Sequence, residues 1–313
     1  MLISRKYAIV GTGAIGGFYG AKLQRSGVDV HFLLNKDYEY VKQHGLVINS
    51  ADGNFVLPEV NAYNDVSKMP RCDVVIVSLK TTHNYLLPKL LPSLVKNDGV
   101  VLVLQNGLNI EVNVADIVGK ERVMGGLCFI CSNKIAPGYI NHLDYGAITL
   151  ADYADKYNYC GITERMEQIA DDFRGAEIPI NLETDLLISR WKKLVWNIPF
   201  NGLSVVLNTT TNKLMANDYT RKLAEELMNE VVAGASGCDR FISPDFVQKM
   251  LDDTVKMKPY SPSMKLDYEA KRSLEVEAIF GNPLREAQNA NIPVPRIEML
   301  YQQLKFLDQG LGN

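Results

Sequence analysis

The stretch YAIVGTGAIGGFYGAKLQRSG, residues 7–27, decides the fold of the N-terminal half of this chain. A short apolar run precedes three glycines in the pattern G-x-G-x-x-G, and the residues after them suit a helix. Between a strand and a helix, this pattern predicts a dinucleotide-binding loop, because glycines permit the tight turn, the approach of a pyrophosphate and the close packing of helix on strand. The alternative is an ordinary strand–turn–helix with spare glycines. The residues expected to bind the cofactor here are Gly11, Thr12, Gly13, Ala14, Ile15 and Gly16.

The residues after the second strand, expected at 28–34, indicate which dinucleotide binds. An NAD-selective site usually has an acid at the end of this strand, where it binds the ribose 2′-OH. Here Asp29 lies at the beginning of the strand, and Asn35 and Lys36 follow its end. An amide and a cation suit a 2′-phosphate, so Asn35 and Lys36 predict NADP(H). Asp37 follows directly and opposes this interpretation, and the alternative for Lys36 is a solvated loop lysine.

The composition is that of an ordinary globular protein of two domains. The chain has 313 residues, 47% of them hydrophobic and 22% charged, with a formal net charge of −3. This balance argues against a nucleic-acid-binding surface. The longest apolar runs are of strand length, far shorter than a membrane span, and no secretory signal is visible, so a cytoplasmic protein without a membrane partner is expected.

The cysteines and histidines do not predict a disulfide framework or a metal site. The five cysteines are an odd number at irregular spacing, and the four histidines are scattered. Cys128 and Cys131 form a C-x-x-C pattern, but the surrounding apolar run predicts a buried strand rather than a redox or metal motif.

Strand and helix signals predict an α/β chain in which an N-terminal Rossmann-type doubly wound domain, residues 1–184, is followed by an all-helical C-terminal domain, residues 185–313. Apolar runs at 72–80, 99–107 and 122–132 are separated by helical stretches, which is typical of parallel strands covered on both faces. Residues 138–153 alternate polar and apolar positions, as an antiparallel strand does. A substrate cleft is expected between the domains. Helices are expected at 186–207, 218–237, 243–257, 265–291 and 296–309.

Several polar residues lie at strand ends or along one helix face, at positions where the fold alone does not require a polar side chain. Lys80 and Asn106 follow two of the expected parallel strands, at the edge where doubly wound sheets bind ligands. Lys193, Asn197 and Asn201 recur every four residues and therefore share one side of a helix whose other positions are largely apolar. Because asparagine is a poor helix former, this stripe predicts a lined cleft. The alternative is a solvated helix face.

With these residues in place, the chain resembles the ketopantoate reductase family over nearly its full length. The stretches GTGAIG, VSLKT, LQNG, WKKLVWNIPFNGLS and SPSMKLDYEAKRSLEVEAIFGNPLREAQNANIPVP carry the resemblance by their order and spacing. It implies NADPH-dependent reduction of 2-dehydropantoate (ketopantoate) to pantoate in pantothenate biosynthesis. The alternatives are a reductase of another small 2-keto acid and a non-catalytic sensor that binds NADP(H).

The resemblance also implies roles for individual residues. Lys193 matches the catalytic lysine, here the general acid, and Glu275 is the second catalytic residue. Asn208 and Asn212 are both candidates for a later asparagine of the family. The implied partners are a small 2-keto acid and a second copy of the chain in a homodimer. The implied substrate-binding residues are Asn197, Asn201, Ser263 and Asn106, and Lys80 and Asn106 are implied as cofactor contacts.

Overall fold

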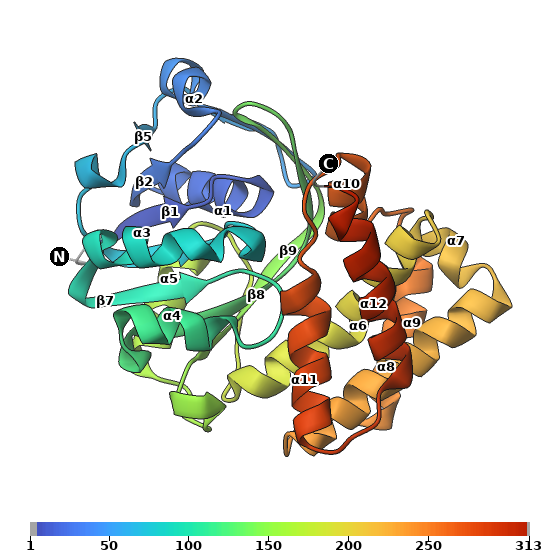
Figure 1. Cartoon of the computed structure of the whole chain (residues 1–313). Helices are drawn as coiled ribbons and strands as arrows, with labels where there is room; N and C mark the ends of the chain where they lie inside the picture. The colour runs from blue at the N-terminus through green and yellow to red at the C-terminus, as the bar shows by residue number, and fades with distance from the viewer. Residues whose placement is uncertain (1–4, 312–313) are drawn as a thin grey trace. The chain divides into compact units, whose positions relative to one another are not determined.

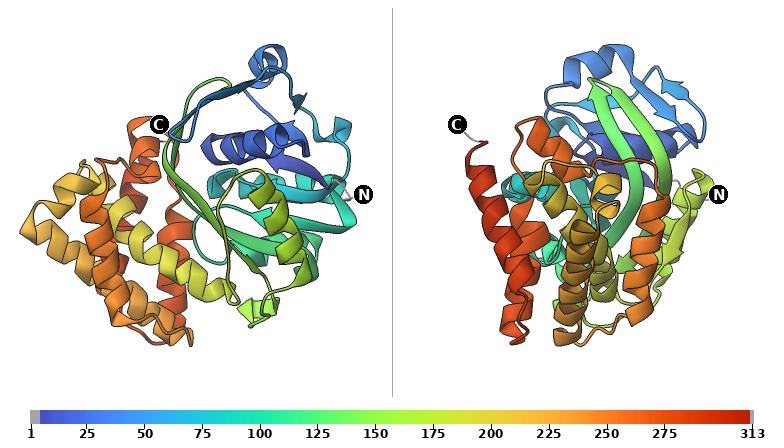
Figure 2. Two further views of the ribbon diagram at one scale, coloured as in Figure 1. Left: turned by 180° about the vertical axis from the view of Figure 1, so that it is seen from behind. Right: turned by 90° about the vertical axis from the view of Figure 1, so that its right-hand side faces the viewer.

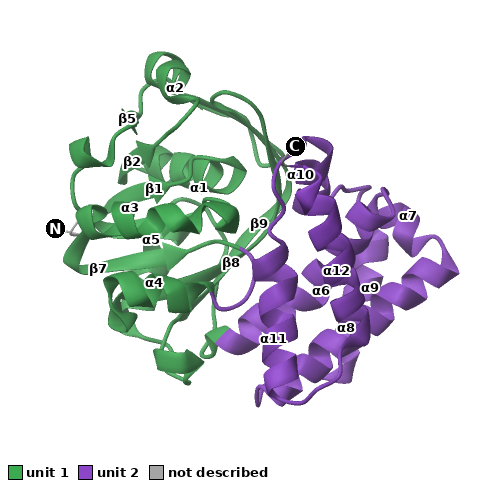
Figure 3. Cartoon of the chain, in the orientation of Figure 1, with its two compact units in different colours: residues 1–105, 110–186 green, residues 106–109, 187–313 purple. Residues whose placement is uncertain are grey.

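The computed structural model describes residues 5–311, which form two compact units (Figure 3). Unit 1 comprises the chain up to Gln105 and the segment Ile110–Leu186; unit 2 comprises Asn106–Asn109 and the chain from Leu187 onward. Unit 1 is an α/β structure and unit 2 is helical, which confirms the predicted fold class. Among these described residues, no helix is both long enough and apolar enough to cross a bilayer.

Unit 1 is built on a sheet of ten strands within the described residues (Figure 1). Its central strands are parallel and follow the order β5–β2–β1–β6–β7–β8, which is the strand order of doubly wound dinucleotide-binding folds. The apolar runs of β1 and β6 are almost fully buried, as expected of strands covered on both faces. These strands are β1 (Lys6–Val10), β2 (Asp29–Leu33), β5 (Asn61–Tyr63), β6 (Cys72–Val77), β7 (Val95–Val103) and β8 (Val123–Ala136).

Helices cover both faces of this sheet. α1 and α5 pack against each other and against β9, while α3 and α4 pack against each other and against β7 and its neighbours (Figures 1 and 2). Cys128 and Cys131 lie buried on β8, which confirms the predicted buried strand. The helices of unit 1 are α1 (Ala14–Arg25), α2 (Tyr38–His44), α3 (Leu87–Leu94), α4 (Ile110–Val118) and α5 (Glu164–Gly175), with short 3₁₀ turns η1 (Val66–Lys68), η2 (Thr81–Leu86), η3 (Lys120–Arg122) and η4 (Asp155–Tyr157).

A long hairpin extends the sheet beyond its parallel part. β9 runs antiparallel to β8, as the alternation at residues 138–153 predicted, and the two strands form the long green ribbons of Figure 2. Further short strands of the sheet lie on the side of β9. The strands on this side are β3 (Leu46–Ser50), β4 (Phe55–Leu57), β9 (Tyr139–Asp152) and β10 (Ile180–Leu182).

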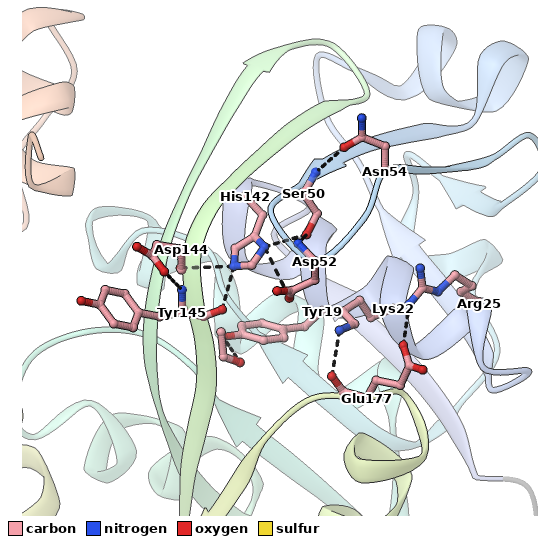
Figure 4. Close-up of polar contacts among 11 residues, drawn as sticks. Tyr19, Lys22, Arg25, Ser50, Asp52, Asn54, His142, Asp144, Tyr145 and Glu177 are labelled. Atoms are coloured by element: carbon pink, nitrogen blue, oxygen red, sulfur yellow. Dashed lines mark hydrogen bonds and ion pairs between the residues drawn. The ribbon is translucent and has the colours of Figure 1, made fainter. Parts of the chain in front are cut away.

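His142 stabilises an irregular part of this hairpin (Figure 4). Tyr145 has a positive φ of 63°, and the pairing register shifts opposite it. The His142 Nε2 lies 2.8 Å from the carbonyl oxygen of Tyr145 and 3.2 Å from that of Asp144. Since carbonyl oxygens only accept, Nε2 carries a proton, and Nδ1 lies 2.8 Å from the Ser50 hydroxyl oxygen and 3.8 Å from an oxygen of the Asp52 carboxylate. The buried ring therefore satisfies carbonyl groups at a β-bulge. The contact between Ser50 and His142 thus has a structural role in the hairpin.

Unit 2 consists of helices packed around their own core, to which Leu108 also belongs. The helix predicted over residues 265–291 is wrong as a single element. The chain leaves the helical conformation after Glu269, where Lys271 has a φ of 53° and the Arg272 N–H donates to the Asp267 carbonyl oxygen. The elements are α6 (Leu186–Val206), α7 (Thr211–Met215), α8 (Asp218–Gly237), α9 (Pro244–Lys256), α10 (Ser263–Glu269), the π-helical turn η5 (Glu277–Gly281), α11 (Asn282–Asn289) and α12 (Pro295–Gln309).

A buried carboxylate on α8 caps the last helix. The Glu230 side chain accepts hydrogen bonds from the N–H groups of Arg296 and Ile297, at 3.0 and 2.9 Å, in the first turn of α12. These N–H groups have no partner inside the helix, and the helix dipole favours a negative charge beside them.

Glu230→Ala is therefore expected to lower the free energy of unfolding by about 2 kcal/mol, because it removes a charged cap and leaves buried donors unpaired. Urea denaturation measures the change. Glu225→Ala, at an exposed position of the same helix, is the control and should change stability by less than about 0.5 kcal/mol. Equal losses in the two variants would contradict a capping role.

Candidate active site

The glycine loop of unit 1 has the shape that a pyrophosphate needs. Gly11 has a φ of 102°, and a Cβ there would lie 2.4 Å from the backbone nitrogen of Leu79. A Cβ on Gly16 would lie 2.2 Å from the Ser78 Oγ, so both glycines are required by close packing against the residues after β6. At Gly13, by contrast, an added Cβ meets no described heavy atom within 4 Å beyond its chain neighbours. The loop is thus tight on its protein side and open at its second glycine, which fits a dinucleotide.

The loop leads directly into α1 and is fastened to the end of β2. Ala14 and Ile15 are the first residues of α1, so their N–H groups are available to an anion at the helix start. The Thr12 hydroxyl donates to the Leu33 carbonyl oxygen at 3.0 Å, which engages this side chain within the protein. This bond holds the end of β2, and the residues after it, beside the glycine loop.

The other predicted cofactor contacts of unit 1 follow strands. Asn35 and Lys36 are exposed and come directly after Leu34, close to the end of β2. Lys80 is half-buried, follows β6 and immediately precedes η2. All three occupy the carboxyl-terminal side of parallel strands, the side on which such sheets bind ligands.

In unit 2, the predicted polar stripe lies on α6. Asn197 and Asn201 are only 3% and 2% exposed, while Lys193 is half-buried. The alternative of a solvated helix face is therefore wrong for the two asparagines. α6 continues through Pro199, which has no N–H to donate to the carbonyl group four residues earlier.

Asn201 brings Ser263 to this stripe. Its Oδ1 accepts a hydrogen bond from the Met264 N–H at 3.2 Å, and this bond is buried. The residue at the N-cap position of α10 is Pro262, whose side chain cannot accept a hydrogen bond from the first N–H groups of the helix. Asn201 accepts one of these hydrogen bonds in its place. Because Ser263 is the first residue of α10, this contact fixes it close to Asn201.

The amide of Asn197 is the least satisfied polar group of the stripe. Its Nδ2 is buried, and it has no hydrogen-bond partner among the residues that the structure describes. A buried donor without a partner is costly, and native proteins rarely retain one without a reason. A ketone or carboxylate oxygen of a bound ligand would satisfy it.

Glu275 and the two candidate asparagines lie near the ends of other elements. Glu275 is 6% exposed and stands two residues before η5. The Asn208 Oδ1 accepts from the Lys265 Nζ of α10, the helix that carries Ser263. The Asn212 Oδ1 instead accepts from the neighbouring Thr210 hydroxyl at 2.7 Å. Of the two, Asn208 is thus linked to a predicted substrate-binding element.

Asn106 is carried by unit 2, whereas the sequence assigned its loop to the first domain. The Leu108 N–H donates to the Ala278 carbonyl oxygen at 2.9 Å, and the Asn282 amide donates to the Leu108 carbonyl oxygen at 2.6 Å. Gly107 has a φ of 115°, and a Cβ there would lie 2.5 Å from the Ala278 oxygen. The loop is thus fixed on η5 and α11, and Asn282, which anchors it, has no sequence signal that marks it as functional.

Within residues 5–311, no group of three or more histidine, cysteine, aspartate or glutamate side chains is arranged to hold a metal ion.

Comparisons with known proteins confirm the family that the sequence resembles. The family model described as ketopantoate reductase PanE/ApbA matches residues 7–155, and that of the family's C-terminal part matches residues 185–308. A 2-dehydropantoate 2-reductase of Nostoc sp. is 64% identical over 97% of this chain and 95% of its own length. The crystal structure of 2-dehydropantoate 2-reductase from Geobacter metallireducens has a TM-score of 0.92 at 43% identity and covers 96% of this chain and 99% of its own.

A more distant structure shares the fold alone. D-Mandelate dehydrogenase with NADH and anilino(oxo)acetate has a TM-score of 0.86 at 21% identity, covering 98% of this chain and 100% of its own. Two family models that span most of the chain and a relative at 64% identity are sufficient for assignment. The chain belongs to the ketopantoate reductase family.

Proposed function

We propose that this chain catalyses the NADPH-dependent reduction of 2-dehydropantoate to pantoate, a step of pantothenate biosynthesis. The observation that carries the proposal is the α6 stripe, in which a lysine shares a helix face with two buried asparagines. One of the two has an amide donor without a hydrogen-bond partner in the described part of the chain. The name of the Nostoc relative, at 64% identity, supports this substrate. As a member of its family, the chain is an oxidoreductase that uses a nicotinamide dinucleotide.

Each proposed site residue of unit 2 has a distinct role. Lys193 donates a proton to the ketone oxygen as it becomes an alkoxide, and its positive charge stabilises the developing negative charge. The Nδ2 groups of Asn197 and Asn201 donate hydrogen bonds to substrate oxygens. For Asn201 it is the Nδ2 that faces this task, because its Oδ1 already accepts from the Met264 N–H. Ser263 donates to the substrate carboxylate, and Glu275 orients Lys193 or the product hydroxyl.

In the same proposal, the cofactor is held by residues of unit 1 and by Asn106, which belongs to unit 2. The open glycine loop and the first N–H groups of α1 bind the pyrophosphate, and Lys80 and Asn106 contribute further contacts. Asn35 and Lys36 bind the 2′-phosphate and select NADP(H). When bound, the reduced nicotinamide supplies the hydride that the substrate carbon accepts.

The proposal is tested by following cofactor oxidation with a panel of 2-keto acids, each with NADPH and with NADH. The panel includes 2-dehydropantoate, smaller aliphatic keto acids and a phenyl-substituted one, because D-mandelate dehydrogenase shares the fold. We expect kcat/KM to be highest with 2-dehydropantoate, and NADPH to exceed NADH by about tenfold or more. Binding of NADPH without oxidation by any keto acid would instead support a sensor.

We also propose that the protein acts in the cytoplasm as a homodimer, as its family resemblance implies. Light scattering of the purified protein measures its mass in solution. A mass of about twice 35.0 kDa supports the dimer, and a mass of 35.0 kDa would exclude it at that concentration.

A further inference from the structure

The loop after β2 carries opposite charges side by side. Lys36 is followed directly by Asp37, and consecutive Cα atoms are about 3.8 Å apart. A carboxylate so close would repel any phosphate bound by Lys36, and an acid near the end of this strand is the usual mark of an NAD site. The loop by itself therefore has no net charge with which to attract a 2′-phosphate.

Asp37 is engaged by the β8–β9 hairpin. Its Oδ2 forms an ion pair with the Nζ of Lys134 on β8 and accepts a hydrogen bond from the Gly138 N–H at 3.4 Å. Its side chain is 13% exposed, against 30% for that of Lys134. In the described part of the chain, the Asp37 side chain makes no capping hydrogen bond to α2, although it stands at the N-terminus of that helix.

The turn of this hairpin is anchored by neighbouring elements of unit 1. The Val47 N–H of β3 donates to the Gly138 carbonyl oxygen at 2.9 Å. On its other side, a Cβ on Gly138 would lie 3.2 Å from the ring of Tyr40 on α2. The hairpin turn is thus held close to β3 and α2, which positions Lys134 beside Asp37.

We propose that Lys134 is a specificity-determining residue for the cofactor's 2′-phosphate, acting by compensation of the Asp37 carboxylate. With Asp37 paired, the positive charge of Lys36 is left for the phosphate. The proposal rests on the NADP(H) preference proposed above. It explains how the site accepts a phosphate although an acid stands near the end of its second strand.

Binding of NADP⁺ and NAD⁺ to the full-length protein, measured by calorimetry without substrate, tests this role. The two ligands differ only in the 2′-phosphate. Lys134→Met is expected to weaken NADP⁺ binding about fivefold and to leave NAD⁺ binding within about twofold. Asp37→Asn should bind NADP⁺ at least as tightly as the wild type. The double variant should bind NADP⁺ about as tightly as the wild type, because removing the cation and the anion of the pair together leaves the charge of Lys36 as it was.

Lys120→Met is the matched control, since Lys120 forms an exposed ion pair with Asp155 at 3.1 Å in the same unit; it should change neither affinity. Thermal unfolding of each variant checks that it is folded. An unchanged NADP⁺ to NAD⁺ affinity ratio in folded Lys134→Met would overturn the proposal, as would a double variant as weak as Lys134→Met. Equal binding of both ligands by the wild type would instead overturn the NADP(H) preference itself.

Discussion

Lys193→Ala is expected to lower kcat for 2-dehydropantoate by about 10²–10⁴ while leaving NADPH affinity unchanged. Reduction of a ketone produces an alkoxide, and a lysine serves it twice, as a positive charge and as a proton donor. Lys193 is half-buried on the face of α6 that also presents Asn197 and Asn201. Removing its ammonium group leaves the amides of the two asparagines in place, which are the proposed substrate-binding donors, so the loss should fall on kcat rather than on KM. Steady-state kinetics and NADPH titration measure the two effects separately.

Lys192→Ala is the matched control, because it removes the same charge one position earlier on α6, where the side chain is also half-buried. It should retain kcat within about threefold. The competing interpretation of Lys193 is a structural ion pair with Glu275. In that case Lys193→Ala would lower Tm, leave kcat per folded molecule nearly unchanged, and show that the general acid lies elsewhere.

The parts of the fold that depend on local sequence were predictable. The glycine loop and the parallel strands have short-range signals, namely glycine spacing and continuous apolar runs, and the structure places them as expected. α8 and α12 were likewise predicted close to their observed bounds. The strands β3, β4 and β5 were missed because they are short, and much of their surface is half-buried or exposed, so their apolar pattern is weak.

The parts that depend on distant contacts were not predictable. The bond between Asn201 and the Met264 N–H joins residues 63 positions apart, and it alone explains why a buried asparagine in α6 positions the start of α10. The same holds for the loop that carries Asn106, which is fixed by Asn282. Helical propensity continued across residues 270–275, but the turn closed by Arg272 on Asp267 ended α10 there.

Asn197 and Asn201 differ in how their side chains are bonded within the protein: the Asn197 Nδ2 has no partner among the described residues, whereas the Asn201 Oδ1 accepts from the Met264 N–H. Removing the Asn197 amide is therefore expected to weaken substrate binding without lowering stability. Asn197→Leu replaces the amide by an apolar side chain of similar volume and removes the buried donor that has no partner in the described chain. Its free energy of unfolding should therefore stay equal or increase. KM for 2-dehydropantoate should rise about 30-fold, the equivalent of a lost hydrogen bond of about 2 kcal/mol to a substrate oxygen.

Asn201→Leu is the comparison that makes this expectation sharp. It removes a similar amide one helical turn further along α6, but it also removes the acceptor for the Met264 N–H. This variant should lose both substrate affinity and stability, the latter by about 1–3 kcal/mol, because a buried donor is left unpaired. Urea denaturation and KM, measured on the same preparations, separate the loss of stability from the loss of substrate affinity. If Asn197→Leu loses as much stability as Asn201→Leu and keeps its KM, then the unpaired amide of Asn197 serves the fold and does not bind the substrate.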